Sequence, residues 1–259
     1  MAELFVNNHF LKLRQEPNTT RAEIALLHAG HRLKVLDASS NLSWARVECT
    51  VEGQVLQGWT AKMYLRPSVN AEVDRLVETA GAQYRKFKWG TLTDSDGAGD
   101  GCALIEEFWK LFPGNPHSCS TAWSGVFVTF VVKSAGLTKK FAGSPKHTVY
   151  MSQAKKDRMA HDSTKAYWAF RPEEEKLRVG DIVGAWRDGS GCPAGPFTYD
   201  SLPGDFCSHC DVVIALRAGK AMGMGGNVSN TVKETEFELD ANGFLVPVKK
   251  RFVVLRRQF

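Results

Sequence analysis

Long apolar segments are missing from this chain. Its longest nearly uninterrupted apolar run, residues 126–132, is seven residues long and contains Thr129, whereas a membrane-spanning helix needs about 18 such residues. The N-terminus also lacks the basic start, apolar stretch and small-residue cleavage site of a secretory signal peptide. We therefore expect no membrane span, synthesis in a bacterial cytoplasm, and any export to the periplasm or cell wall through a specialised system.

Cysteines are too few, and too irregularly spaced, to form a disulfide scaffold: there are six in 259 residues. Cys207, His209 and Cys210 resemble one half of a zinc knuckle, but no second half follows. We therefore expect buried or paired structural cysteines, no metal and no cofactor, and the roles of Cys207 and Cys210 stay open. Zinc-finger and aromatic-basic RNA-binding signatures are also missing, so no nucleic-acid partner is expected.

The composition is that of an ordinary globular protein. Hydrophobic residues make up 43% of the chain and charged residues 24%. The 33 Lys and Arg residues outnumber the 28 Asp and Glu residues, which gives a formal charge of +5. This surplus suits an anionic partner such as a cell wall, or it is an ordinary solvated surface. The length exceeds the usual size of one domain, which favours one large or two unequal domains.

Residues 4–66 contain short alternating stretches separated by turn signals about every ten residues, which predicts a small β-barrel. The stretches LKLRQEP, AGHRLKVLD, SWARVE and GWTAKMYL resemble, in order, the motifs of bacterial SH3-like domains. The resemblance implies a cell-wall-binding module. Pro67 and Ser68 mark a boundary, so we expect an SH3-like domain at residues 1–67 and a second domain at residues 71–259.

The second domain is predicted to be α+β, with helices on an antiparallel sheet. Helical spacing predicts a helix over residues 71–88, and a segment that is apolar on all sides predicts a buried helix over residues 123–136. Strands are expected at residues 178–186, 209–216 and 221–226, with residues 252–255 closing the sheet. The Gly/Pro-rich residues 189–205 carry no helix or strand signal, and loops of this length are usually functional.

A nucleophile at the start of a buried helix, followed by a sheet headed by a histidine, is the arrangement of papain-like hydrolases. Ser124 occupies the helix start, where free N–H groups stabilise an oxyanion, and His209 is placed to transfer the proton. A tight turn at residues 217–220 would bring Asn227 next to His209 across the hairpin. Asp211, on the same strand face as His209, is the competing orienter. Asn227 is preferred.

Motifs of the second domain resemble NlpC/p60-type amidases in order. They are the helix AWSGVFVTFVVKSAG and the strands RVGDIVGAW, SHCDVVIAL and MGMGGNVSNTV. With residues 144–150, they resemble a little-characterised bacterial branch that has Trp-Ser where the other members have Trp-Cys. The resemblance implies a papain-like fold over residues 71–259 and cleavage of amide bonds in peptidoglycan.

Several residue roles stay open at this stage. Ser124 is a true nucleophile, the replacement of a Cys in an inactivated protein, or part of a domain that binds without cutting. Cys119 is a weaker alternative nucleophile. His147 either lines the cleft or braces a loop, and Trp123 is expected in the core rather than as a substrate platform.

The function expected from these observations is an amidase or endopeptidase that acts on peptidoglycan. Without a signal peptide, a delivered antibacterial effector or a phage-type lysin is expected, and an effector would imply a cognate immunity protein as a partner. The alternatives are a non-catalytic protein that binds the wall or a partner on a hydrolase scaffold, and an acyltransferase.

Overall fold

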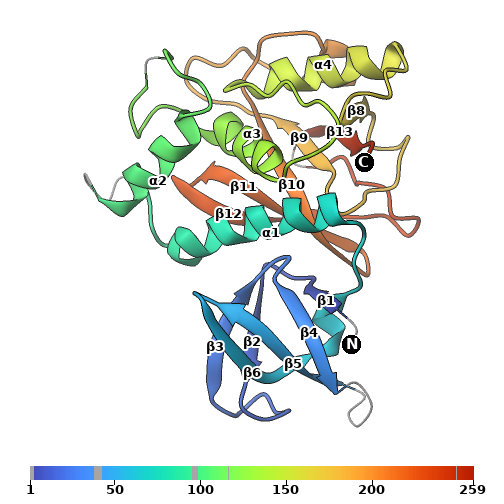
Figure 1. The fold of residues 1–259 in the computed structure, drawn as a ribbon. Coiled ribbons are helices and arrows are strands. Elements are labelled where there is room, and N and C mark those ends of the chain that lie inside the picture. The colour runs from blue at the N-terminus through green and yellow to red at the C-terminus, as the bar shows by residue number, and fades with distance from the viewer. Residues whose placement is uncertain (1–2, 38–42, 95–98, 116, 249) are drawn as a thin grey trace.

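The computed structural model describes residues 3–37, 43–94, 99–115, 117–248 and 250–259. These residues form a mixed α/β fold with two antiparallel sheets and four α-helices. The α-helices are α1 (Ala71–Lys86), α2 (Asp100–Trp109), α3 (Ser124–Ser134) and α4 (His147–Met159). In Figure 1 the N-terminal sheet lies below α1, and the second sheet and the other helices lie above it.

The N-terminal sheet is curved and has seven strands. They are β1 (Glu3–Val6), β2 (Phe10–Arg14), β3 (Glu23–His28), β4 (Arg32–Asp37), β5 (Trp44–Val51), β6 (Gln54–Ala61) and β7 (Leu65–Arg66), in the order β3-β2-β6-β5-β4-β1-β7. Alternate residues point into a core that includes Leu13, Leu33 and Val47, as expected for a sheet buried on one face.

The expected closed barrel is not formed. Strands β3 and β7 are the two edges of the sheet, and the described residues contain no pairing between them. The reason is the length of β7, which has two residues and is followed by Pro67, a residue without a backbone N–H to donate. The SH3-like resemblance therefore stays a prediction for this part of the chain.

The second sheet has six strands in the order β12-β11-β10-β9-β13-β8. The strands are β8 (Tyr167–Phe170), β9 (Ile182–Trp186), β10 (Ser208–Arg217), β11 (Lys220–Val228), β12 (Thr231–Glu238) and β13 (Arg251–Arg257). Helices α1 and α3 pack on β10 and β11, and α4 packs on β8, β10 and β13. A second apolar cluster, which includes Val213, Phe237 and Val254, packs apart from the helix-side core. Strand β10 has apolar neighbours on several sides. It is therefore buried at six consecutive residues instead of showing alternate buried and exposed residues.

Several sequence predictions are confirmed here and others are wrong. The helices at residues 71–88 and 123–136 and the three successive strands are present. Helices α2 and α4 and strands β8 and β12 were not predicted. Residues 252–255 do not close the sheet, because β13 lies between β9 and β8. The loop at residues 189–205 holds a single short 3-10 helix at Tyr199–Ser201. No helix in the described part of the chain combines the length and the apolar character needed to cross a membrane.

The N-terminal sheet and α1 pack against each other without space for extra atoms. A Cβ atom added to Gly81 of α1 would lie 2.3 Å from the carbonyl oxygen of Ala29. A Cβ added to Gly30 would lie 2.4 Å from the backbone nitrogen of Glu78, and Gly30 also has a φ of +72°. Ala29 belongs to the same apolar core as α1. This junction is therefore a close-packed contact rather than a loose linker.

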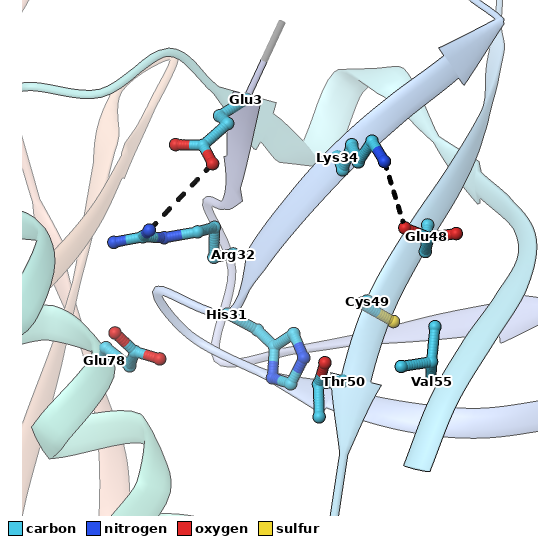
Figure 2. A pocket seen from close by; sticks show the side chains of 9 residues that line it. All are labelled: Glu3, His31, Arg32, Lys34, Glu48, Cys49, Thr50, Val55 and Glu78. Carbon is cyan, nitrogen blue, oxygen red and sulfur yellow. Dashed lines mark hydrogen bonds and ion pairs between the residues drawn. The ribbon is translucent and has the colours of Figure 1, made fainter. Parts of the chain in front are cut away.

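A cavity of 360 Å³ opens at the same junction, between Glu78 of α1 and strands β1, β4, β5 and β6 (Figure 2). Arg32 pairs with Glu3, and Lys34 pairs with Glu48. His31 points into this cavity from the turn before β4. Most of the charged side chains in the lining are therefore paired with one another, and the one histidine among the lining residues is buried.

Candidate active site

Ser124 lies at the first position of the buried helix α3. Its side chain is 7% exposed, and its hydroxyl Oγ is 2.7 Å from Nε2 of His147. The residue before it, Trp123, is the N-cap and provides no side-chain capping hydrogen bond. The first intrahelical hydrogen bond runs from Phe127 N to Trp123 O. The N–H groups of the first turn therefore have no intrahelical acceptors and face the N-terminal end of α3, where Ser124 lies.

His147 reaches Ser124 because the chain before α4 packs directly on α3. Thr129 of α3 accepts a hydrogen bond from Ser144 N at 3.0 Å and donates one to Ser144 O at 3.2 Å. A Cβ on Gly125 would lie 2.1 Å from the carbonyl oxygen of Pro145. Glycine at this position therefore lets the two segments touch, which brings the start of α4 over the start of α3.

The other ring nitrogen of His147, Nδ1, is hydrogen-bonded to the hydroxyl of Tyr150. Tyr150 lies three residues further along α4, which is one turn away on the same helix face. Cys210, the buried free cysteine of β10, lies close enough to this hydroxyl to help raise its pKa. Ser124, His147 and Tyr150 are thus linked by two consecutive buried hydrogen bonds.

Burial controls the ionisation of the side chains at this site. His147 is 4% exposed, and burial lowers its pKa well below the usual value, with smaller contributions from His209 and the charge of Arg187. Burial also raises the pKa of Tyr150 and Cys210. At neutral pH the imidazole of His147 is therefore neutral, and one of its nitrogens is free to accept a proton.

His209 stands beside His147 and belongs to a second pair. The centroids of the two rings are 5.5 Å apart at an interplanar angle of 66°. His209 Nε2 is 3.1 Å from Oδ1 of Asp211, two residues along β10 on the same face. Gly225 of β11 faces this pair, and a Cβ there would lie 2.8 Å from His209 Nε2.

The predicted orienter Asn227 is not the hydrogen-bonding partner of His209 in the described residues; Asp211 takes that place. The pairing of β10 with β11 begins at Val212 and Met224, and Asn227 lies beyond it with a φ of 58°. Asn227 instead lines the cavity that also contains Ser124 and His147. Trp123 does not line that cavity: its side chain is fully buried and stacks on Phe87 in the core.

The cavity at Ser124 has a volume of 560 Å³ and is bounded by the start of α3, the start of α4 and the loop between β9 and β10. A second cavity of 450 Å³ is lined by His209, Asp211 and the end of β11. The two cavities share Arg187 and Asp188. They therefore adjoin along the end of β9, with Ser124 in one and His209 in the other.

The described residues contain two disulfides, and one of them lies at the site. Cys192 and Cys207 are joined across the loop between β9 and β10, and both line the cavity at Ser124. Cys102 and Cys119 are also joined, so Cys119 is not a free thiol and the alternative nucleophile at that position is excluded in this state. Cys102, Glu106 and Cys119 have potential metal-ligating atoms within 4.8 Å of one another. The disulfide occupies both thiols, so this cluster lacks the thiolates that a metal requires.

The structure adds three residues to the predicted site: Tyr150, Cys210 and Arg187. For Tyr150 the available signal was its spacing of three residues from His147, which aligns two side chains on a helix. That signal depends on recognising α4. Cys210 and Arg187 carry no local signal, because only tertiary packing brings the starts of α3 and α4 to the paired strands β9 and β10.

The fold and the site define a mixed α/β protein with a buried Ser–His pair at a helix start. The model of the family described as "Uncharacterized protein conserved in bacteria (DUF2272)" matches residues 85–259, and the chain belongs to this family. No curated protein matches the chain.

Among solved structures, the chain is similar to NlpC2 from Trichomonas vaginalis at 12% identity. The alignment covers 98% of this chain and 72% of that chain, with a TM-score of 0.28. A similarity at this level adds nothing to the argument from the site.

Proposed function

We propose that this protein hydrolyses amide bonds in peptidoglycan peptides by acyl transfer through Ser124. The observation that carries the proposal is the hydrogen bond of 2.7 Å between Ser124 Oγ and a neutral His147, in a cavity large enough for part of a peptide. A nucleophile within hydrogen-bonding distance of a general base is the geometric requirement for this chemistry.

In the proposed reaction, Ser124 Oγ attacks the carbonyl carbon while its proton moves to His147 Nε2. The hydroxyl oxygen of Tyr150 accepts the hydrogen bond of His147 Nδ1–H, which leaves Nε2 as the acceptor. The N–H groups at the start of α3 stabilise the oxyanion. His147 then returns the proton to the leaving amine, and a water molecule activated by the same nitrogen hydrolyses the ester.

This assignment moves the general base from His209, as expected from the sequence, to His147. His209 and Asp211 line the adjoining cavity, and His209 helps to lower the pKa of the base, His147. Charged side chains line both cavities, including Lys146, Asp188 and Asp205. Such a lining suits a polar peptide better than the acyl chain that an acyltransferase would hold.

Two disulfides support a site of action outside the cytoplasm, because disulfides persist in oxidising compartments. We infer that the protein acts in the periplasm or cell wall. If it is a delivered toxin, an immunity protein that covers the cavity at Ser124 would protect the cell that makes it.

The test is digestion of purified peptidoglycan by the full chain, with mass analysis of the fragments. Ser124→Ala and His147→Ala should each reduce cleavage by about 1000-fold or more. His209→Gln leaves the Ser124–His147 pair intact and should reduce it less. His161→Ala, which changes an exposed histidine, is the matched control.

Equal losses in His147→Ala and His161→Ala would remove His147 as the base. Full loss in His209→Gln with activity retained in His147→Ala would restore the assignment expected from the sequence. No cleavage by the unmodified protein, but cleavage by Ser124→Cys, would show that a cysteine is the functional nucleophile. No cleavage by either protein would favour the binding-protein alternative.

A further inference from the structure

We propose that Arg187 forms a recognition site for a carboxylate of the peptide substrate, next to the bond that is cut. This inference rests on the proposed function and specifies its substrate class: a peptide with a free carboxylate rather than a neutral or amidated one. Arg187 is a specificity residue in this proposal and takes no part in bond breaking.

The position of Arg187 is the first argument. It directly follows β9 and is one of two residues shared by the cavity at Ser124 and the cavity at His209. Its backbone N–H donates to Cys207 O at 2.9 Å, and Cys207 is held in turn by its disulfide with Cys192. Arg187 is therefore exposed to solvent, and its backbone is held by a hydrogen bond to a disulfide-bonded residue.

The cavity at Ser124 and the adjoining cavity at His209 together form a cleft whose carboxylates already have partners. Asp205 pairs with Lys146, Asp188 with Lys250, and Asp211 with His209. The described residues contain no hydrogen bond or ion pair to the guanidinium of Arg187, although it is exposed and lies among these pairs. An incoming carboxylate would find in Arg187 a bidentate donor set without a competing protein anion.

Arg251 is the other cation of the lining without a carboxylate partner. It donates instead to the carbonyl oxygen of Glu236 at 2.9 Å, lies over the ring of Phe237, and is 6% exposed. Its guanidinium is thus already bonded and largely buried. This leaves Arg187 as the cation available to a ligand in the described part of the cleft.

The electrostatic link between Arg187 and His147 gives the site a second consequence. The positive charge of Arg187 contributes to the low pKa of His147. A substrate carboxylate bound to Arg187 would offset this contribution, so that His147 becomes a stronger base when the correct peptide is present. Neutral peptides would bind without this gain.

The test measures binding separately from cleavage. Soluble muropeptides are prepared in two forms: one with free stem-peptide carboxylates, and one in which carbodiimide and ammonia have converted them to carboxamides. Binding of each form to the full-length Ser124→Ala protein is measured by titration calorimetry. We expect the free-carboxylate form to bind about 10-fold to 100-fold more tightly, as for a charge-assisted hydrogen bond.

Adding Arg187→Gln to Ser124→Ala should abolish the difference between the two forms and leave the affinity for the carboxamide form nearly unchanged. Arg187→Lys should restore part of the difference. The control is Arg21→Gln, which changes an exposed arginine paired with Glu16 in the N-terminal sheet region and should preserve the full difference.

The two proposals fail separately. Equal affinity for both peptide forms, or a preference that survives in Arg187→Gln, would overturn the role of Arg187 even if the chain cleaves peptidoglycan. A preference that depends on Arg187, together with no cleavage by either the unmodified protein or Ser124→Cys, would sustain the recognition site and reject the hydrolase. In that case the protein is a carboxylate-binding protein of the cell wall.

Discussion

Acidification should destabilise this protein through two histidines at the junction between the N-terminal sheet and α1. His28 and His31 are 5% and 7% exposed, and their rings are hydrogen-bonded between His31 Nδ1 and His28 Nε2 at 3.3 Å. Figure 2 shows His31 beside the cavity at this junction. Burial, supplemented by the charge of Arg85, lowers the pKa of each histidine from 6.5 to about 4.

The sign and size of the effect follow from the difference in proton binding. Between pH 6.5 and about 4 the unfolded chain binds a proton at each site and the folded protein does not, so the free energy of unfolding decreases as the pH falls. A pKa lowered from 6.5 to about 4 corresponds to about 3 kcal/mol of lost stability at each site at pH 4. Above about pH 6.5 neither histidine is protonated in the unfolded chain, so none of this stability is lost. Two such sites together approach the total stability of a typical domain.

The assay is urea denaturation of the unmodified protein and two variants at intervals from pH 7 to pH 4. His31→Gln removes one titrating group, so its loss of stability over this range should be smaller than that of the unmodified protein by about 3 kcal/mol. Part of the dependence should remain in the variant, because His28 and the buried His147 titrate with the same sign. His161→Gln, at an exposed position, should retain the full loss. An unchanged pH dependence in His31→Gln would falsify the argument.

Other changes test the junction, the disulfide at the cleft and the N-terminal sheet. Gly81→Ala should lower the free energy of unfolding by about 1–3 kcal/mol, since the new methyl group would overlap the carbonyl of Ala29; a melting temperature equal to that of the parent would contradict this packing. Replacing Cys192 and Cys207 by serine should cost about 3 kcal/mol in urea denaturation, given their separation of 15 residues, and no change would mean that the loop is held by other contacts. Deleting residues 1–67 should lower the melting temperature, because this segment packs on α1. If the shortened protein melts unchanged and loses only sedimentation with intact sacculi, the segment is a targeting module instead.

Local patterns in the sequence were sufficient to predict the helices and strands whose burial is uniform or strictly periodic. Helix α3 is apolar on all sides, and a helix of this kind is stable only at the centre of a fold. The turn between β10 and β11 pairs Arg217 with Lys220, as the sequence predicted. Helix α4 escaped prediction because polar residues such as His147, Ser152 and Asp157 occupy its buried face. A periodicity argument relies on apolar residues at such positions.

The candidate site likewise combines features that the sequence predicts with contacts that it does not. The sequence by itself determined that Ser124 starts a buried helix, and that His209 and Asp211 share one face of a strand, because helix and strand periods are local properties of the chain. Only the tertiary structure decided that His147, 23 residues from Ser124, is the histidine at its hydroxyl. That contact depends on the packing of one segment on another at Gly125, and such an encounter between distant parts of the chain leaves no periodic trace in the sequence.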